Sequence, residues 1–250
     1  ALFLSFFGLL PYTPIALAVS GVFIVGVCLL VNAIFARVFG APSNIESVYT
    51  TALILALIIA PIKSVSGLPF LAIAAGLAMA SKYIIAINKK HIFNPAALAV
   101  ALTAIIMGQS ANWWVGNLYM LPFVFIGGLL MVRKLRRFDL VLSFIIFAIT
   151  SILGYFFLKH SNLLLITKEI LFSSPLFFFA CVMLTEPMTT PPTRNLRILY
   201  GTLTGFLFAP FVHIGSVYST PELALLVGNI FSYAVSPKYR LVLELKKKLQ

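Results

Sequence analysis

The residue types best suited to chemistry gather at the ends of apolar runs. The densest polar group spans 185–194, where four threonines accompany Glu186 and lead into Arg194. Threonine hydroxyls both donate and accept hydrogen bonds, so this loop suits the polar edge of a flavin or quinone, or a small polar solute. The alternative is a well-capped turn at a membrane interface, in which Glu186 offsets Arg194 or Arg197.

A second polar break lies around Asn94. Asn94 precedes Pro95, as Thr220 precedes Pro221 later in the chain, and such a pair is typical of an N-cap followed by the first residue of a helix. Such a helix start offers free backbone N–H groups to a bound molecule. Lys90 and His91 stand just before it and suit an anion, although a bias of basic residues toward one membrane face explains the lysine equally. The break at 61–67 is either a second wall of the same site or a plain loop.

Two adjacent tryptophans, Trp113 and Trp114, stand in an uncharged loop that ends at Asn117. Their indoles either stack on an aromatic cofactor or belong to the belt that tryptophan commonly forms at membrane interfaces. The three histidines are poorly placed for a haem, which needs a facing pair. Two cysteines inside apolar runs exclude a disulfide scaffold, a four-cysteine zinc site and an iron–sulfur cluster. The sequence has no glycine-rich phosphate loop, catalytic carboxylate pair or Ser-His-Asp set, so any cofactor is expected to be organic.

The elements that must position these residues are membrane helices. Of 250 residues, 61% are hydrophobic, and only 18 are basic and 6 acidic. No ordinary water-soluble domain could cover its surface with this composition. The formal charge of +12 does not indicate nucleic acid as a partner, because the basic residues bunch between apolar runs and act as topology signals.

Breaks at charges, prolines and polar clusters divide the chain into ten apolar segments. The segments are 2–10, 13–36, 48–62, 69–87, 94–108, 118–132, 140–158, 170–185, 196–212 and 220–237. Several have about 15 residues, fewer than the ~20 that a straight membrane helix needs, so we expect half-helices that meet broken backbone inside the bundle. The larger basic clusters fall on one face when the segments alternate, so that face is cytoplasmic and both termini lie there. Lys82 is expected to extend its ammonium to this interface.

An internal repeat emerges when the chain is compared with itself at an offset of 126 residues. Pro61 then falls on Pro187, and Pro95 falls on Pro221. The two halves, about 1–111 and 127–237, would run in opposite senses and form an inverted repeat of five plus five helices. Such repeats place their site near the membrane midplane, at the repeat interface. The alternative is coincidence among 14 prolines.

Three motifs, in this order, resemble those of one known family. Residues 90–96 read Lys-His-Ile-Phe-Asn-Pro-Ala, similar to its "FNPA" helix start, and 184–191 read Leu-Thr-Glu-Pro-Met-Thr-Thr-Pro, which resembles its "ATDPVTSP" loop. Residues 220–222, Thr-Pro-Glu, followed by Gly-Asn-Ile-Phe at 228–231, are similar to its "PEG…ANLF" last helix. The family is that of RnfD and NqrB, membrane subunits of ion-pumping, ferredoxin- or NADH-linked flavin complexes.

The resemblance implies an all-α membrane protein of about ten transmembrane helices, in the inverted 5+5 arrangement of urea transporters, in a bacterial-type inner membrane. It also implies bound FMN or riboflavin and electron transfer toward a quinone or another extracytoplasmic acceptor, as part of an oxidoreductase complex. Family members attach FMN to a threonine in an "SGAT" or "GETS" segment, but 108–119 contain no threonine, so we expect a non-covalent flavin. FAD and NAD(P) are expected only on a partner or fused cytoplasmic flavin reductase. Residues 1–237 would form the membrane domain, and 238–250 would begin the extension toward that reductase.

The expected flavin pockets take the polar residues of the three motifs and the tryptophan loop. They are Asn94, Pro95, Thr185, Glu186, Thr189, Thr190 and Asn229, with Trp113, Trp114 and Asn117 near the outer pocket. Two other functions stay open at this point. The same fold could serve as a channel or transporter for a small neutral solute, or as a cofactor-free membrane anchor for a reductase.

Overall fold

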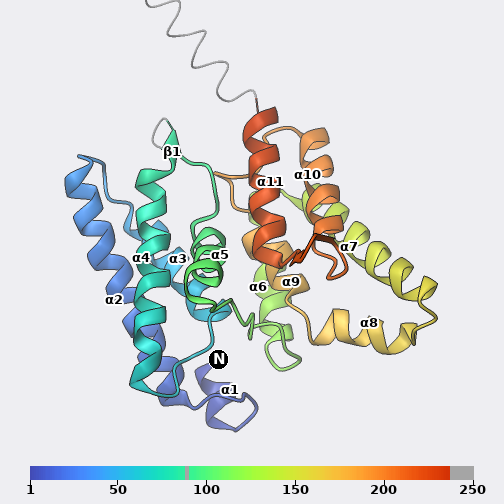
Figure 1. The fold of residues 1–250 in the computed structure, drawn as a ribbon, viewed down its shortest axis with the longest axis horizontal. Helices are drawn as coiled ribbons and strands as arrows, with labels where there is room; N and C mark the ends of the chain where they lie inside the picture. The colour runs from blue at the N-terminus through green and yellow to red at the C-terminus, as the bar shows by residue number, and fades with distance from the viewer. Residues whose placement is uncertain (88–89, 237–250) are drawn as a thin grey trace, which may run out of the picture.

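The computed structural model describes residues 1–87 and 90–236, which are mostly helical (Figure 1). The helices are α1 (Leu2–Phe6), α2 (Pro14–Val38), α3 (Ile45–Ile58), α4 (Leu68–Ile84), α5 (Pro95–Met107), α6 (Leu121–Leu135), α7 (Phe138–Leu158), α8 (Leu163–Phe172), α9 (Leu176–Phe178), α10 (Arg194–Leu207) and α11 (Pro221–Val235). The other elements are a 3-10 turn η1 (Val65–Gly67), a π-helical stretch η2 (Phe179–Met183), and the hairpins β1 (Ala86–Ile87) with β2 (Lys90–His91) and β3 (His213–Ile214) with β4 (Val217–Tyr218). The predicted extension at 238–250 lies outside the described residues.

Long apolar helices make the chain a membrane protein. Among the described residues, Pro14–Val38, Val65–Ile84 and Phe138–Leu158 are long and apolar enough to cross a bilayer, and the bent pair of α8 with α9–η2 is a fourth candidate. Large apolar side chains stay exposed along them, such as Ile15 and Val22 on α2, as lipid-facing positions require. The apolar helices α3, α5 and α11 have only 14, 13 and 15 residues, so length and composition alone do not identify ten spans.

The predicted segments differ from the observed helices at two places. The segment predicted over 2–10 is helical only over Leu2–Phe6, because Gly8 adopts a left-handed backbone conformation with φ of 70° just after the helix. Residues 163–169, left between predicted segments, form most of α8, which ends inside the predicted segment 170–185. The side chain of Asn162 accepts two backbone N–H groups of the first turn and so stabilises this helix start.

Helices α5 and α11, which open with Pro95 and Pro221, begin as the sequence predicts. The Oδ1 atom of Asn94 accepts the backbone N–H of Ala97 at 3.0 Å, and the hydroxyl of Thr220 accepts that of Leu223 at 3.4 Å. A proline occupies the first helical position of both α5 and α11. Both N-cap predictions are confirmed.

Helices α7 and α10 pack backbone to backbone. Gly201 and Gly205 lie about one turn apart on α10 and face α7. A Cβ atom at Gly205 would lie 2.6 Å from the carbonyl oxygen of Phe144, and one at Gly201 would lie 2.6 Å from that of Leu140. Membrane helices approach this closely where small residues recur every four positions.

Helices α5 and α11 bring the two parts of the molecule together. On one side α4 packs on α2 and α5, on the other α10 packs on α7 and α11, and α5 contacts α11 directly. In Figure 1, α2, α3 and α4 lie to the left of α11, whereas α7 and α10 lie to its right. A site between α5 and α11 therefore takes residues from both halves of the chain.

Candidate functional site

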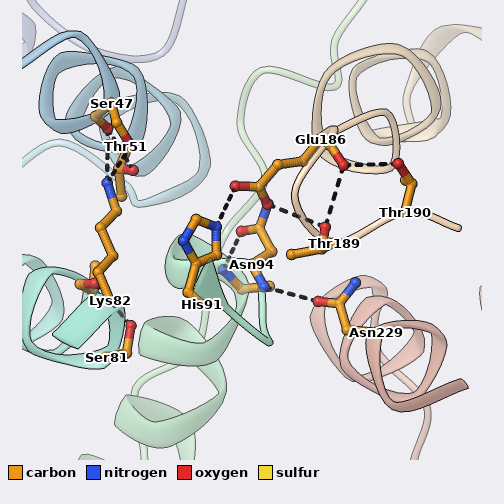
Figure 2. Close-up of polar contacts among 12 residues, drawn as sticks. Ser47, Thr51, Ser81, Lys82, His91, Asn94, Glu186, Thr189, Thr190 and Asn229 are labelled. Atoms are coloured by element: carbon orange, nitrogen blue, oxygen red, sulfur yellow. Dashed lines mark hydrogen bonds and ion pairs between the residues drawn. The ribbon is translucent and has the colours of Figure 1, made fainter. Parts of the chain in front are cut away.

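A largely buried polar cluster surrounds the carboxylate of Glu186 (Figure 2). Its Oε1 lies 2.8 Å from Nε2 of His91, and its Oε2 accepts hydrogen bonds from Nδ2 of Asn94 at 2.9 Å and from the hydroxyl of Thr189 at 3.3 Å. The backbone N–H of Asn94 donates to Oδ1 of Asn229 at 2.8 Å. We call these five residues the Glu186 cluster. It joins the start of α5, the loop after η2, and α11.

Asn229 extends the Glu186 cluster into the core between α10 and α11. Its Nδ2 donates to the hydroxyl of Tyr200 at 3.0 Å, and both side chains are fully buried. A Cβ atom at Gly228 would lie 2.9 Å from the ring of Tyr200, so the close approach of the two helices depends on that glycine. The amide of Asn229 thus has a partner for its oxygen and for its nitrogen, as a buried amide requires.

Substituting Tyr200 by phenylalanine is expected to lower the free energy of unfolding by about 1–3 kcal/mol, because the amide of Asn229 loses its acceptor inside the core. Thermal unfolding of the detergent-purified protein measures the effect. Tyr49→Phe is the matched control, since Tyr49 is 44% exposed on α3. Equal melting temperatures for the two variants would show that the buried hydroxyl contributes nothing.

Two arginines hold the loop that carries Glu186. The Nη1 atom of Arg137 donates to the carbonyl oxygen of Pro191 at 3.1 Å, and that of Arg197 donates to the carbonyl oxygen of Pro192 at 2.8 Å. Because one arginine precedes α7 and the other lies on α10, the loop is tied to the pair of helices that pack backbone to backbone.

The interpretation in which Glu186 offsets Arg194 or Arg197 is wrong. Arg197 instead pairs with Asp139 on α7, with 2.6 Å between Nη2 and Oδ2. The hydrogen-bonding partners of Glu186 include His91, which comes from a segment 95 residues earlier. The loop therefore turns its carboxylate toward α5 rather than toward the helix that follows it.

The other two predicted threonines of the loop bond to nearby backbone. The buried hydroxyl of Thr185 donates to the carbonyl oxygen of Cys181 at 2.7 Å, and that of Thr190 donates to the carbonyl oxygen of Glu186 at 3.0 Å. Both bonds close a local turn. They fix the backbone on either side of the carboxylate.

Lys82 lies on the other side of His91 from Glu186 (Figure 2). Its Nζ donates to the carbonyl oxygen of Ser47 at 2.8 Å and to the hydroxyl of the same residue at 3.0 Å. The charges of Lys82 and Glu186 attract each other across the intervening space. The ammonium thus links α4 to the first turn of α3. The extension of Lys82 to the membrane interface stays a prediction.

Besides a water-sized hollow of about 10 Å³ lined by His91, Thr189 and Asn229, two cavities flank the Glu186 cluster. The smaller has a volume of about 110 Å³, and four of the predicted residues line it: Asn94, Pro95, Thr185 and Glu186. The larger, of about 380 Å³, lies among the ends of α2, α3 and α4, and its walls include Asn32, Phe39, Asn44, Ser47, Lys82, Tyr83 and His91. Ser47 lines both cavities. None of the ten predicted residues lines the larger one.

The tryptophan loop makes its own contacts, apart from the Glu186 cluster. The indole N–H of Trp113 donates to Oε2 of Glu222 on the first turn of α11 at 3.0 Å. The indole N–H of Trp114 is shared between two backbone carbonyl oxygens at the end of α3, each at 3.0 Å. Asn117 bonds only within its own loop in the described structure. Both tryptophans are buried, so the loop packs into the bundle.

Lys82, Tyr200 and Glu222 had no predicted role in the site. His91 was predicted to lie beside a bound anion, whereas in the structure it contacts the carboxylate of Glu186. One signal for these contacts was present. A carboxylate next to an apolar run must find hydrogen-bond donors when it is buried, and both Glu186 and Glu222 are such residues. Nothing in the sequence indicates which donors they find.

The site is equipped for hydrogen bonding rather than for metal coordination. Within 1–87 and 90–236, no three His, Cys, Asp or Glu side chains gather so that they could hold a metal ion. The larger cavity presents amide, hydroxyl, ammonium and imidazole groups together with two aromatic rings. Such walls suit an organic molecule that has both polar and apolar parts.

No family model matches the chain, and no curated protein matches it either. The contacts and cavities described above are therefore the basis for the function proposed below.

Proposed function

We propose that the chain is a membrane-embedded, flavin-binding electron-transfer subunit or domain of an oxidoreductase complex, similar to those of the RnfD/NqrB family. The observation that carries the proposal is the meeting of the three motifs. Asn94, Glu186 and Asn229 come one from each motif and belong to one hydrogen-bonded cluster, although 135 residues separate the first from the last. The adjoining cavity of about 380 Å³ falls within the ~300–1,000 Å³ range of ligand pockets.

The proposal includes the two inverted halves, for which the order of elements is the support. Helices α2, α3 and α4, the β1–β2 hairpin and α5 recur in order as α7, α9–η2, α10, the β3–β4 hairpin and α11. Leu68 and Arg194 begin corresponding helices, as do Pro95 and Pro221. Within each pair the two residues are 126 positions apart. On this proposal α3, α5, α11 and the bent α8–η2 pair are half-helices, which brings the number of spans to about ten.

The larger cavity has the size and the lining that a flavin needs. Asn32, Lys82 and His91 offer hydrogen-bonding groups for the polar edge, and Phe39 and Tyr83 offer rings for the apolar part. The smaller cavity, at about 110 Å³, is below the size of a cofactor pocket. A bound flavin supplies one- and two-electron chemistry. The role of the Glu186 cluster is then to hold His91 in the wall of the flavin cavity.

The sidedness and partners follow from the same proposal. The end with the β1–β2 hairpin, at the top of Figure 1, faces the cytoplasm of a bacterial-type cell, because basic residues flank the helices there. A flavin reductase with FAD and NAD(P) delivers electrons on that side. A quinone or an extracytoplasmic acceptor receives them.

The test is flavin bound to the purified chain, measured by visible absorbance. Ala41→Trp is expected to lower the bound flavin severalfold, because Ala41 lines the larger cavity and an indole would fill much of it. Ala33→Trp is the matched control, since Ala33 is exposed on α2 and does not line that cavity. Acid precipitation should release the flavin into the supernatant, as expected for non-covalent binding.

A colourless protein from flavin-replete cells would contradict the proposal. Flux of a small neutral solute into proteoliposomes, independent of redox state, would then identify a channel. Neither flavin nor flux, together with binding of a reductase, would identify an anchor.

A further inference from the structure

The larger cavity has basic residues but no acidic ones in the described part of its lining. Among the described residues that line it, Lys82 and His91 are basic and none is acidic. The carboxylate with which Lys82 interacts electrostatically belongs to Glu186, and its oxygens already have His91, Asn94 and Thr189 as hydrogen-bonding partners. The cavity therefore attracts anions and repels cations.

Lys82 has hydrogen-bonding capacity beyond its contacts within the chain. An ammonium group carries three donors, and the two bonds that the structure gives Lys82 both go to uncharged oxygens of Ser47. The hydroxyl of Ser47 accepts one of them, which leaves its own hydrogen able to donate. Lys82 and Ser47 together form a pair of donors on one wall of the cavity.

The start of α3 adds to the preference of the larger cavity for anions. Asn44, the N-cap of α3, lines the cavity together with Ser47 of its first turn. The N-terminus of a helix carries a partial positive charge. At the start of α3 the backbone N–H of Ser47 donates to Oδ1 of Asn44, and Glu46 in the first turn is exposed. The exposed Arg37 and Lys90 stand next to this wall in sequence, close to Phe39 and to His91.

We propose that the larger cavity binds a phosphate ester, with the phosphate held by Lys82 and Ser47 at the start of α3. A compact ammonium beside a helix N-terminus is a common phosphate-binding arrangement. The preference for an anion stands on the cavity alone, whereas the assignment of FMN rather than riboflavin as the carrier rests on the proposed function. The phosphate comes either from such a soluble ester or from a lipid headgroup, and the experiment separates these sources.

The experiment titrates FMN, riboflavin and inorganic pyrophosphate into the full chain, purified in a neutral detergent. We expect FMN to bind about tenfold or more tightly than riboflavin, as a charge-assisted hydrogen bond predicts, and pyrophosphate to compete with it. Lys82→Met should bind the two flavins equally. Lys63→Met is the matched control, because Lys63 is exposed and does not line the cavity, and it should keep the preference for FMN.

Each remaining outcome decides between the two proposals. Equal binding of FMN and riboflavin to the unmodified chain, without competition by pyrophosphate, would overturn the phosphate site and leave the flavin proposal standing. Thermal stabilisation by pyrophosphate that Lys82→Met abolishes, without binding of either flavin, would support the phosphate site and contradict the flavin proposal. Lys82→Arg keeps the charge and should keep the preference, which covers the case in which the methionine variant does not fold.

Nanodiscs distinguish the two sources of phosphate. If phosphatidylglycerol blocks pyrophosphate binding and phosphatidylcholine does not, the occupant is the headgroup of an anionic lipid. If both membranes leave the binding unchanged, the occupant is a soluble ester.

Discussion

Replacing Glu186 by alanine is expected to lower the free energy of unfolding by about 3 kcal/mol, because it removes a largely buried carboxylate and leaves its hydrogen-bond donors without an acceptor. Nε2 of His91 and Nδ2 of Asn94 both lose a partner at less than 3 Å. Asn94 also caps α5, so the start of that helix loses its fixed position. We expect the larger cavity to change shape and to lose its ligand, because His91 is part of its wall.

The measurement is thermal unfolding in detergent, together with gel filtration to exclude aggregation. Glu169→Ala is the control, since it removes an exposed carboxylate from α8 and should leave the melting temperature almost unchanged. Glu186→Gln keeps one acceptor oxygen for Asn94, so its melting temperature should lie between those of Glu186→Ala and Glu169→Ala. If Glu186→Ala has the same melting temperature as the unmodified protein, the cluster does not stabilise the fold.

Replacing Gly205 by leucine is expected to destabilise the protein by at least about 3 kcal/mol and to prevent its accumulation in the membrane. A Cβ atom at this position would already lie 2.6 Å from the carbonyl oxygen of Phe144, which is backbone and cannot rotate away. Helix α10 would have to move away from α7. That movement would carry Tyr200 away from Asn229 and strain the ion pair of Arg197 with α7.

Gly154→Leu is the matched control for this change. Gly154 lies on α7, and nothing stands within 4 Å of the place where its Cβ would be. Expression level and melting temperature of the two variants, compared in the same detergent, measure the difference. Similar values for both would show that the close packing of α7 against α10 is dispensable.

Local features of the fold could be predicted from the sequence. The hydropathy of the chain predicts membrane helices, and the Asn-Pro and Thr-Pro pairs predict the starts of α5 and α11, because capping depends on residues only three positions apart. Most of helix α8 was missed, since Lys168 and Glu169 interrupt its apolar pattern and the predicted segment begins only at residue 170. A helix that bends at a break is hard to delimit by hydropathy alone.

The partners within the candidate site could not be predicted in the same way. The sequence singled out Asn94, Glu186 and Asn229 separately, but their hydrogen bonds join segments about 90 to 135 residues apart, and no local pattern encodes them. The role of Lys82 is another such case. Its expected extension to the interface follows from its place near a helix end, whereas its bonds to Ser47 depend on how α3 packs against α4.

The contact between Asn94 and Asn229 also imposes an order on biogenesis. As the ribosome delivers the chain, Asn94 is present long before α11, so its backbone N–H has no native acceptor during most of synthesis. An unpaired buried amide costs free energy, and among the described residues α11 supplies the oxygen that satisfies this one. The start of α5 therefore acquires this native hydrogen bond only after the helix that carries Asn229 has been synthesised.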